Sequence, residues 1–450
     1  GGRDRCRTSF WLDRPPADVT ALPRPGERAL VVGLGRSGMA MARYLTRQGL
    51  QVRAVDRRPA SELEAALAEL AELTAAESRT GGYDETALDG CALVCASPGV
   101  PWDDALLQAA RMRGIPVSSE IDLFLSRCPG QILGVTGTNG KTTTTAMLGA
   151  ILRQGDRPVL VGGNIGDTVL DRLPEITPRH RVVLELSSFQ LESAADPRTQ
   201  VGVVLNVTPD HLDRHHTFER YLDAKARLVE ALREDGTAVL NGEDENCRAL
   251  AERTRARVVW YDEHRPVPHL HVPGRHNELD ALAAAAAARA VGMDDARIQA
   301  GLESFIGVEH RLELVVEEGG IRWYNDSKAT NPEAGLPALR AFPGEDLVVI
   351  AGGHGSGFDL REWTREVRSR TVGAVLIGES APLLESELAG HPLRRAETLE
   401  EAVEEAARLL PEGGVVVLSP AYKSYDMFHD FEERGRLFKE LVRARSGGGA

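Results

Sequence analysis

Short apolar runs alternate with amphipathic stretches along most of this 450-residue chain. The runs are rich in valine, leucine and isoleucine, and the stretches between them repeat apolar residues at helical spacing. Strands that alternate with helices are typical of parallel α/β units, because a helix returns the chain to the start of the next strand. The pattern therefore predicts α/β domains, and the length predicts two to three of them.

Three series of such elements can be separated. The first has strands expected at Ala29–Val32, Val52–Val55, Ala92–Cys95 and Ile115–Val117 and helices at Met39–Gln48, Glu62–Leu73 and Asp103–Arg113. The second has strands at Gln131–Val135, Arg181–Leu186, Val201–Asn206 and Thr237–Asn241 and helices at Ala146–Arg153, Phe218–Arg233 and Glu278–Val291. The third opens with a hairpin, Leu312–Val316 and Ile321–Tyr324, and continues with strands at Leu347–Ala351, Ala374–Ile377 and Val415–Leu418. We divide the chain into domains 1–119, 120–308 and 309–450, and expect the first 20 or so residues to be poorly ordered or not native.

Composition narrows the class of protein. Hydrophobic residues make up 42% and charged residues 27%, as in a soluble enzyme, and a net charge of −14 argues against a nucleic-acid-binding surface. The five cysteines are scattered without a C-x-x-C pair, which favours a reducing cytoplasm over a disulfide framework or a thiolate metal site. The longest apolar stretch, Ala281–Ala288, is too short to insert into a membrane.

The stretch Gly134–Thr145, GVTGTNGKTTTT, follows a predicted strand and precedes a predicted helix. A glycine-rich turn at a helix N-terminus points backbone N–H groups and the helix dipole at one place, which suits phosphate. The spacing has one residue more than a Walker A loop between its first glycine and the Gly-Lys pair. Lys141 adds a mobile positive charge, and the Thr142 hydroxyl is placed for Mg²⁺. We predict a phosphate-binding loop at Gly137-Thr138-Asn139-Gly140-Lys141-Thr142.

A second glycine motif, Gly33-x-Gly35-x-x-Gly38, also lies between a strand and a helix, and Asp56 ends the next strand. This is the dinucleotide fingerprint in its expected context, with an acid that could hold a ribose hydroxyl. The motif alone favours NAD, but the same geometry cradles any nucleotide diphosphate. Further candidates at the same end of the sheet are Arg36, Ser37, Ser97 and Gly99, although an ordinary turn explains the last two equally well.

Candidate metal ligands surround the phosphate loop. Glu185 ends a strand and could ligate a Mg²⁺ that bridges ATP phosphates, with a structural salt bridge as the alternative. The cluster His211, His215 and His216 suggests zinc only superficially, because cysteine is absent and Asp and Pro residues are interleaved. Lys225, on the following helix, would be a solvated charge on sequence alone. A site for ATP beside a second nucleotide fold favours a ligase that activates a nucleotide-linked substrate.

The third series carries a polar loop, Asn325–Asn331, directly after a strand. Helix capping alone could explain it, but Asp326 and Lys328 would also suit a ribose and a transferring phosphoryl group. An aromatic-rich segment, Ser424–Phe431, follows the last strand, and packing is an equally good interpretation there.

Taken together, these motifs resemble those of the Mur ligases of peptidoglycan synthesis. The match covers nearly the whole chain after about residue 27, and its motifs occur in the family's order: VVGLGRSG, SPGV, GVTGTNGKTT, GGNIG, LELSSFQLE, NVTPDHLDRH, PGRHN, EHRLE, NDSKATN and SPAYKSYDMFHDFEERG. GTNGKT marks the superfamily, whereas GLGxSG, NDSKATN and the FEERG ending favour the branch that adds D-glutamate to UDP-N-acetylmuramoyl-L-alanine. The resemblance implies an α/β fold of three domains: Rossmann-like for the UDP substrate, P-loop ATPase-like for ATP and Mg²⁺, and a Rossmann-like C-terminal domain that closes on ATP and binds the amino acid. It also implies a cytoplasmic monomer that neither binds nucleic acid nor inserts into a membrane.

The resemblance assigns roles residue by residue. The UDP substrate would contact Gly33, Gly35, Arg36, Ser37, Gly38, Asp56, Arg57, Ser97, Gly99 and, at its muramoyl part, Asn164. ATP would contact Gly137, Thr138, Asn139, Gly140, Lys141, Thr142, Thr143, Asn277, Arg311, Asp326 and Lys328. The metal ligands would be Thr142, Glu185, His211 and a carbamylated Lys225, and the acceptor site would contain Thr330, His354, Ser424 and Phe431. Catalysis would rest on Lys141, Glu185, His211, Lys225 and Lys328.

Two positions depart from the family pattern. Its GGxGK segment has a lysine that pairs with a carboxylate of glutamate, whereas this chain has Ser356 there, and Asp280 replaces an adenine-side asparagine. L-glutamate or another amino acid therefore stays open as the acceptor, and we hypothesise that His354 replaces the missing charge. The alternatives from other classes are an NAD-dependent oxidoreductase and a non-catalytic nucleotide-binding protein.

Overall fold

Three sheets organise this chain in a computed structural model that describes residues 22–73, 77–164, 168–261, 269–270, 272–355 and 357–447. Ser356 and the first 21 residues, on which two expectations above fall, lie outside the described residues. The first two sheets belong to one compact unit, made of residues up to 265 and 283–294. The third sheet belongs to a second unit, residues 266–282 and 295–450.

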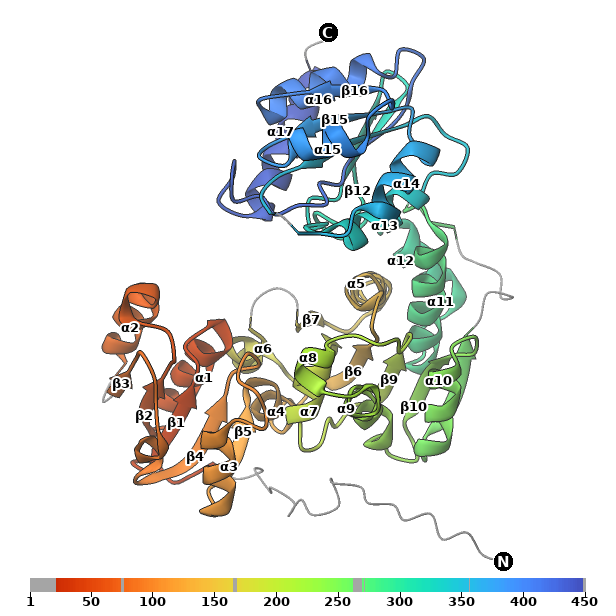
Figure 1. Cartoon of the computed structure of the whole chain (residues 1–450). Coiled ribbons are helices and arrows are strands. Elements are labelled where there is room, and N and C mark those ends of the chain that lie inside the picture. The colour runs from red at the N-terminus through yellow and green to blue at the C-terminus, as the bar shows by residue number, and fades with distance from the viewer. Residues whose placement is uncertain are drawn as a thin grey trace, which may run out of the picture. The chain divides into compact units, whose positions relative to one another are not determined.

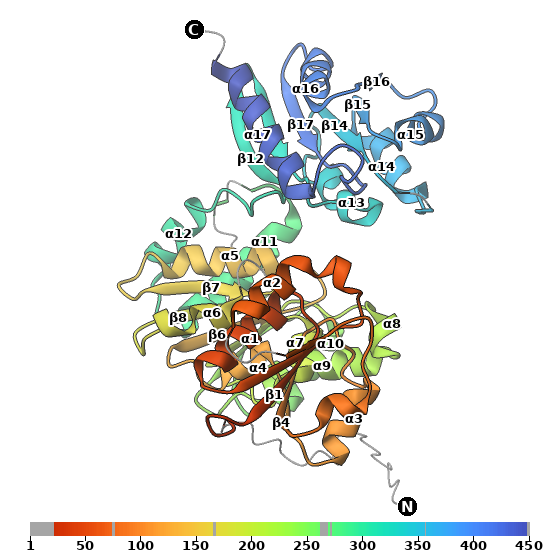
Figure 2. The same cartoon turned by 90° about the vertical axis from the view of Figure 1, so that its left-hand side faces the viewer.

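The first sheet is parallel, with the strand order β3-β2-β1-β4-β5. Alternate residues of its central strand face different cores, since Ala29 and Val31 pack in the cluster that includes α1, and Leu30 and Val32 in the cluster that includes α3. Figure 2 shows these two helices together with β1 and β4. The elements are β1 (Arg28–Val32), α1 (Arg36–Arg47), β2 (Gln51–Val55), α2 (Glu64–Glu72), β3 (Glu77–Arg79), β4 (Cys91–Ala96), α3 (Ala105–Met112), β5 (Val117–Ser119) and α4 (Glu120–Leu125).

The second sheet is also parallel, in the order β11-β10-β9-β6-β8-β7. It shares a hydrophobic cluster with α1 and α4 of the first sheet, and Arg43 Nε donates to Asp171 Oδ1 at 3.1 Å beside that cluster. Its strands are β6 (Gln131–Thr136), β7 (Val159–Gly163), β8 (Arg181–Glu185), β9 (Val201–Val204), β10 (Thr237–Asn241) and β11 (Arg257–Tyr261). The helices along this part of the chain are α5 (Lys141–Leu152), α6 (Val169–Arg172), α7 (Ser188–Ser193), α8 (Leu212–His215), α9 (Phe218–Glu230), α10 (Glu245–Leu250) and α11 (Arg275–Ala290) (Figure 1).

The third sheet has the order β12-β13-β17-β14-β15-β16, and only its edge strand β12 is antiparallel. The predicted hairpin is confirmed, and both glycines of its turn, Gly319 and Gly320, have positive φ. Its elements are β12 (Glu313–Glu318), β13 (Ile321–Asn325), β14 (Leu347–Gly352), β15 (Gly373–Ile377), β16 (Leu393–Arg395), β17 (Gly414–Leu418), with α12 (Asp295–Glu303), α13 (Pro332–Arg340), α14 (Arg361–Arg370), α15 (Ala381–Glu387), α16 (Leu399–Arg408) and α17 (Phe431–Gly447).

Some predicted boundaries are wrong. Helix α5 begins at Lys141 rather than Ala146, because burial of its four consecutive threonines outweighs their low helix propensity. The strand predicted at Ile115–Val117 lies at Val117–Ser119, since Pro116 has no N–H to donate to a sheet. Strands β3, β7, β11 and β16 were not predicted. Among the described residues, no helix has the length and apolarity needed to cross a bilayer.

Candidate active site

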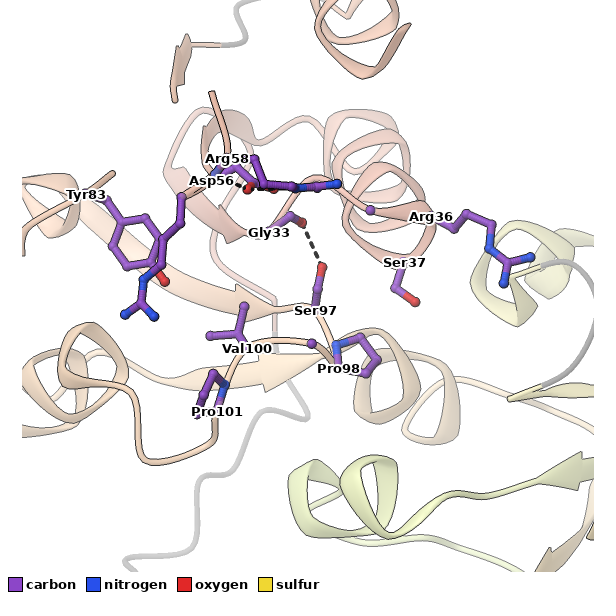
Figure 3. A pocket seen from close by; sticks show the side chains of 13 residues that line it. Gly33, Arg36, Ser37, Asp56, Arg58, Tyr83, Ser97, Pro98, Val100 and Pro101 are labelled. Carbon is purple, nitrogen blue, oxygen red and sulfur yellow. Dashed lines mark hydrogen bonds and ion pairs between the residues drawn. The ribbon is translucent and has the colours of Figure 1, made fainter. Parts of the chain in front are cut away.

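A cleft of about 440 Å³ opens where β1, β2 and β4 end, at the point where the strand order of the first sheet reverses (Figure 3). Ligands of open α/β sheets bind at such switch points, and the volume is typical of small-molecule sites. Most residues that the sequence assigned to the UDP substrate line the cleft, except Gly38 and Asn164. The cleft also contains five residues that were not assigned to it: Arg58, Tyr83, Pro98, Val100 and Pro101. The lining consists of Gly33, Gly35, Arg36, Ser37, Asp56, Arg57, Arg58, Tyr83, Ser97, Pro98, Gly99, Val100 and Pro101.

Gly38 has a different role from the other motif glycines. A Cβ atom at this position would lie 1.8 Å from the Gly33 carbonyl oxygen, so only glycine lets α1 pack this closely against the end of β1. Ser97 Oγ donates to the same Gly33 oxygen at 2.7 Å (Figure 3). Gly38 and Ser97 therefore fix the shape of the turn from two sides.

Both carboxylate oxygens of Asp56 accept hydrogen bonds from the protein. Its Oδ2 accepts from the Leu34 N–H at 2.7 Å and from the Arg58 guanidinium at 2.8 Å, and its Oδ1 accepts from the Arg58 N–H and Nε at 2.9 and 3.1 Å. Although burial opposes the charge, these donors lower the pKa of Asp56 to about 2. The carboxylate therefore holds the glycine turn and Arg58 in place.

The remaining arginines of the cleft differ in their partners. The Arg57 guanidinium pairs with Asp104 at 2.6 Å and lies 5.1 Å from the centre of the Tyr83 ring. Arg36 forms no ion pair with any residue that the structure describes, and its side chain extends from the first turn of α1 (Figure 3). Arg36 is thus the cation of this cleft that remains available to an anionic ligand.

The phosphate loop lies at the corresponding switch point of the second sheet, where β6 is flanked by β8 and β9. Gly140 has a φ of +83°, and a Cβ atom on Gly137 would lie 2.9 Å from Leu205 Cβ, so both positions require glycine. Asn206, which follows β9, fixes the tip of the loop. Its carbonyl accepts from the Thr138 N–H at 2.9 Å and its Oδ1 from the Asn139 N–H at 2.8 Å.

Two lysine side chains converge on the carbonyl oxygen of Gly137. Lys141 Nζ donates to it at 3.0 Å, and Lys225 Nζ at 2.7 Å. Lys225 is only 1% exposed, so its interpretation as a solvated surface charge is wrong. Burial and the neighbouring Lys141 lower the pKa of Lys225 to about 7. Both effects favour the neutral amine form of Lys225.

Glu185, the last residue of β8, lies between Val135 of β6 and Gly163 of β7 in the sheet. It is 2% exposed, and its Oε1 accepts from Asn164 Nδ2 at 3.2 Å. Its Oε2 is buried without a hydrogen-bond partner, and no ion pair of Glu185 occurs in the described part of the chain, which argues against the salt-bridge alternative. An unsatisfied carboxylate oxygen beside a phosphate loop and the buried Thr142 fits a Mg²⁺ ion, which takes few protein ligands and several from phosphate and water.

The three histidines after β9 face different partners. His211 caps α8 with a φ of +52° and lies 3.5 Å from Asp210, and His216 faces Asp103 at 3.3 Å. His215 is buried against Ser188 Oγ at 2.9 Å, and burial lowers its pKa to about 4. In the described ranges, no group of three or more His, Cys, Asp or Glu side chains is placed to hold a metal ion.

One residue near this loop was missed by sequence reasoning. Tyr221, on α9, is buried, and its hydroxyl lies 3.0 Å from Thr138 Oγ1. Its ring also lies 4.6 Å from the Lys225 ammonium. A tyrosine one helical turn before a predicted site lysine was the signal available in the sequence.

In the second unit, the carboxyl ends of β13 and β17 bring together two motifs that are far apart in sequence. Asp326 accepts from Ser419 Oγ at 2.7 Å and from the Leu312 N–H at 3.2 Å. Burial raises the pKa of Asp326 to about 7. The Lys328 ammonium lies 5.9 Å from the centre of the Phe431 ring, so a residue expected to contact ATP lies next to one expected to contact the acceptor amino acid. Thr330 follows on the same loop, half-buried, and Ser424 is buried.

A fully buried arginine connects these segments and was not singled out in the sequence. Arg434 donates to the carbonyl and hydroxyl oxygens of Ser327 at 2.8 and 2.9 Å, and to the Tyr422 carbonyl at 3.2 Å. Its position in the FEERG motif is therefore explained by its structural role, because it ties α17 to the loops after β13 and β17. Asn277, in the first turn of α11, is also buried and donates to the Pro273 carbonyl at 2.6 Å.

The glycine-rich segment after β14 is paired with the loop after β17. His354 Nδ1 lies 2.8 Å from Glu379 Oε2, and the backbones of His354 and Lys423 form an antiparallel bridge. Arg311 forms a similar short bridge with Val308 before β12. The structure thus places every predicted acceptor and C-terminal ATP residue in the second unit.

Comparison with protein families finds three matches along the chain. Residues 27–119 match the Mur ligase MurD-like N-terminal domain, residues 135–268 the Mur ligase middle domain, and residues 310–422 the Mur ligase glutamate ligase domain. Among curated relatives, the UDP-N-acetylmuramoylalanine--D-glutamate ligase of Pelotomaculum thermopropionicum is 41% identical, with 92% of this chain and 97% of the relative covered. The ligase of the same name from Solibacter usitatus is 42% identical, with 93% and 98% covered.

Solved structures agree on the fold. The UDP-N-acetylmuramate-alanine ligase MurC of Thermotoga maritima matches with a TM-score of 0.57 at 22% identity, covering 93% of this chain and 99% of that one. MurF of Acinetobacter baumannii matches with a TM-score of 0.59 at 17% identity, covering 92% and 93%. These likenesses show a shared architecture of three α/β domains.

Proposed function

Because this chain belongs to the Mur ligase family, we propose that it is the ATP-dependent ligase that joins D-glutamate to UDP-N-acetylmuramoyl-L-alanine in peptidoglycan synthesis. The observation that carries the proposal is about 40% identity, over more than nine-tenths of the chain, to relatives named for that reaction. The oxidoreductase alternative loses its basis, since the family accounts for both glycine loops without a nicotinamide.

Each of the three domains would bind a different substrate. Residues 1–119 would bind the UDP part of the substrate, residues 120–308 would bind ATP, and residues 309–450 would bind the amino acid and close on ATP. The free Arg36 in the first cleft supports the first assignment, because a diphosphate needs an unpaired cation. Arg311, Asp326 and Lys328 would meet the nucleotide upon closure, as would Asn277 at the adenine.

In the central domain, the residues Gly137 to Thr143 would hold the ATP phosphates with backbone N–H groups and the N-terminus of α5. Lys141, now donating to the loop's own carbonyls, would turn to the γ-phosphate, whose charge exceeds that of a carbonyl dipole. Mg²⁺ held by Thr142, Glu185 and His211 would neutralise charge on the transferring phosphoryl group.

Lys225 supports a further assignment. Carbamylation forms a bond between a neutral amine nitrogen and the carbon of CO₂ and releases one proton, which leaves an anion that can serve as a metal ligand. A pKa of about 7 gives Lys225 the neutral form that this reaction needs, which an ordinary lysine lacks at pH 7. The carbamate would replace the hydrogen bond to Gly137 and help to hold a second Mg²⁺.

The reaction would proceed in two steps. The alanyl carboxylate attacks the γ-phosphorus of ATP, forming an acyl phosphate and ADP, and Lys141 stabilises the charge that moves onto the β–γ bridging oxygen. The amine of glutamate then attacks the acyl carbon, and the tetrahedral intermediate expels phosphate. Exclusion of water protects the acyl phosphate from hydrolysis, which is a reason for the domains to close.

One assay tests the proposal. Phosphate release from ATP is measured with UDP-N-acetylmuramoyl-L-alanine plus D-glutamate, and then with L-glutamate or no amino acid. We expect release that requires both the UDP substrate and D-glutamate. Release with L-glutamate alone would assign a different acceptor, and release that needs no UDP substrate would contradict the ligase assignment itself.

A further inference from the structure

Lysine is rare in this chain, because only five of its 53 basic residues are lysines. Lys141, Lys225 and Lys328 belong to the proposed ATP site, and Lys439 forms ion pairs with two glutamates at 2.7 and 3.0 Å. A lysine side chain differs from arginine in carrying a compact ammonium on a flexible stem. Lys423 is the fifth lysine, and the roles described above do not account for it.

The backbone holds Lys423 directly beside the glycine-rich segment after β14. The His354 N–H donates to the Lys423 carbonyl at 2.8 Å, and the Lys423 N–H donates back to the His354 carbonyl at 3.2 Å. Gly353 makes this approach possible, since a Cβ atom there would lie 2.1 Å from the Lys423 carbonyl oxygen. Opposed residues of an antiparallel pair project their side chains to the same side, so Lys423 and His354 share one face.

The two basic side chains on this face differ in availability. The His354 imidazole is matched by Glu379 at 2.8 Å, so this pair offers little net positive charge to a ligand. Lys423 is exposed and forms no ion pair with a residue that the structure describes. Its neighbour Ser424 is buried at the proposed acceptor site. The segment in which the family resemblance implies a lysine therefore has beside it an ammonium without an ion pair in the described part of the chain, on the residue that faces His354 in the bridge.

Resting on the proposed function, we propose that the Lys423 ammonium pairs with a carboxylate of the incoming glutamate and replaces the lysine that related ligases carry at the position of Ser356. Lys423 is then a specificity-determining residue for the acceptor. This proposal takes the place of the hypothesis that His354 supplies the charge, because the His354 imidazole already lies 2.8 Å from a carboxylate oxygen of Glu379.

The test compares the Michaelis constants of three substrates in the full-length enzyme. Lys423→Met removes the charge but keeps most of the side-chain stem, and it is expected to raise the KM for D-glutamate at least about tenfold while leaving the KM values for ATP and the UDP substrate within about threefold. Adding Ser356→Lys to this variant returns an ammonium to the position used by related ligases and is expected to lower the glutamate KM again.

Arg408→Ala is the matched control. Arg408 is an exposed cation of the same unit, paired with Glu405, at the end of α16 that leads into β17, whereas Lys423 follows the opposite end of that strand. This control is expected to keep all three KM values. A glutamate KM unchanged in Lys423→Met, or a rise that the double variant does not reverse, would overturn the inference. Wild-type enzyme without D-glutamate-dependent phosphate release would instead overturn the proposed function.

Discussion

The two glycine-rich loops of the first unit, Gly33–Gly38 and Gly137–Thr142, have the same backbone arrangement but differ in the side chains around them. Each follows the central strand of a parallel sheet, at a switch point, and leads into a helix N-terminus. At the first loop, the carboxylate of Asp56 is saturated by four protein donors. At the second loop, Glu185 has a buried oxygen without a partner, and Lys225 has a depressed pKa.

This difference separates binding from chemistry. A site whose polar groups all have hydrogen-bond partners is stable without a ligand and changes little when one binds. Such a site suits the binding of the nucleotide part of a substrate, which does not react. A site with buried polar groups that lack partners destabilises the folded protein until a ligand and a metal ion supply those partners. Polar groups held in this way are typical of catalytic centres. The backbone alone therefore favours phosphate at both loops, and the unsatisfied groups of the second loop are the reason that we propose the reaction to occur there.

The largest effect is expected from Lys141→Ala. This variant removes the only lysine of the phosphate loop, so transition-state charge on the γ-phosphate loses its protein partner, and kcat should fall about 10³-fold or more. Steady-state phosphate release measures the change. A fall of less than about tenfold would mean that Lys141 is not part of the reacting site.

Glu185→Gln should change activity and stability in opposite directions. Loss of the charged ligand is expected to lower kcat about 10²-fold, whereas removal of an unsatisfied buried carboxylate should stabilise the metal-free protein by about 1–2 kcal/mol. Kinetics and urea unfolding without Mg²⁺ measure the two effects. Lower stability in this variant would show that the carboxylate is already satisfied in the resting protein.

Carbamylation of Lys225 should depend on pH. Below a pKa of about 7 the side chain holds a proton and cannot attack CO₂, so the carbamate and the activity that needs it are lost as pH falls from 8 to 6. NMR of enzyme in ¹³C-bicarbonate should show a carbamate carbon at pH 8 that disappears in Lys225→Arg. A carbamate signal that persists in this variant belongs to another amine.

Asp56→Asn should change stability with the opposite sign to Glu185→Gln. The amide cannot accept from the donors that surround the carboxylate, so the free energy of unfolding should fall by about 1–3 kcal/mol at pH 7. The folded pKa of about 2 lies below the unfolded value of about 3.9, so this stabilisation is complete above pH 4 and is lost as pH falls towards 2. Urea unfolding at pH 7 and pH 3 checks both the size and the trend.

The sequence was sufficient for the fold class and for the backbone of both loops. Glycine spacing after an apolar strand is local information, and most of the first motif lines the cleft as expected. Helix α5 shows the limit, because its threonines are helical only through burial against neighbours that the local sequence does not show.

The partners of each site residue required the structure. Asp56 could be recognised as an acid at a strand end, but its saturation depends on Arg58 and on the N–H of Leu34 in a different segment. Lys225 has the sequence context of a surface cation, and only its burial beside Lys141 explains its pKa. Arg434 and Tyr221 were missed because long-range packing, rather than a motif, gives them their contacts.

The central claim is that the first loop binds the UDP substrate and the second loop binds ATP. Titration calorimetry with UDP-N-acetylmuramoyl-L-alanine in the absence of ATP tests this claim most directly. Lys141→Ala is expected to bind it with the wild-type Kd, and Arg36→Ala about tenfold more weakly, because one charge-assisted contact to the diphosphate is lost. Weakened binding in Lys141→Ala together with wild-type binding in Arg36→Ala would contradict the account.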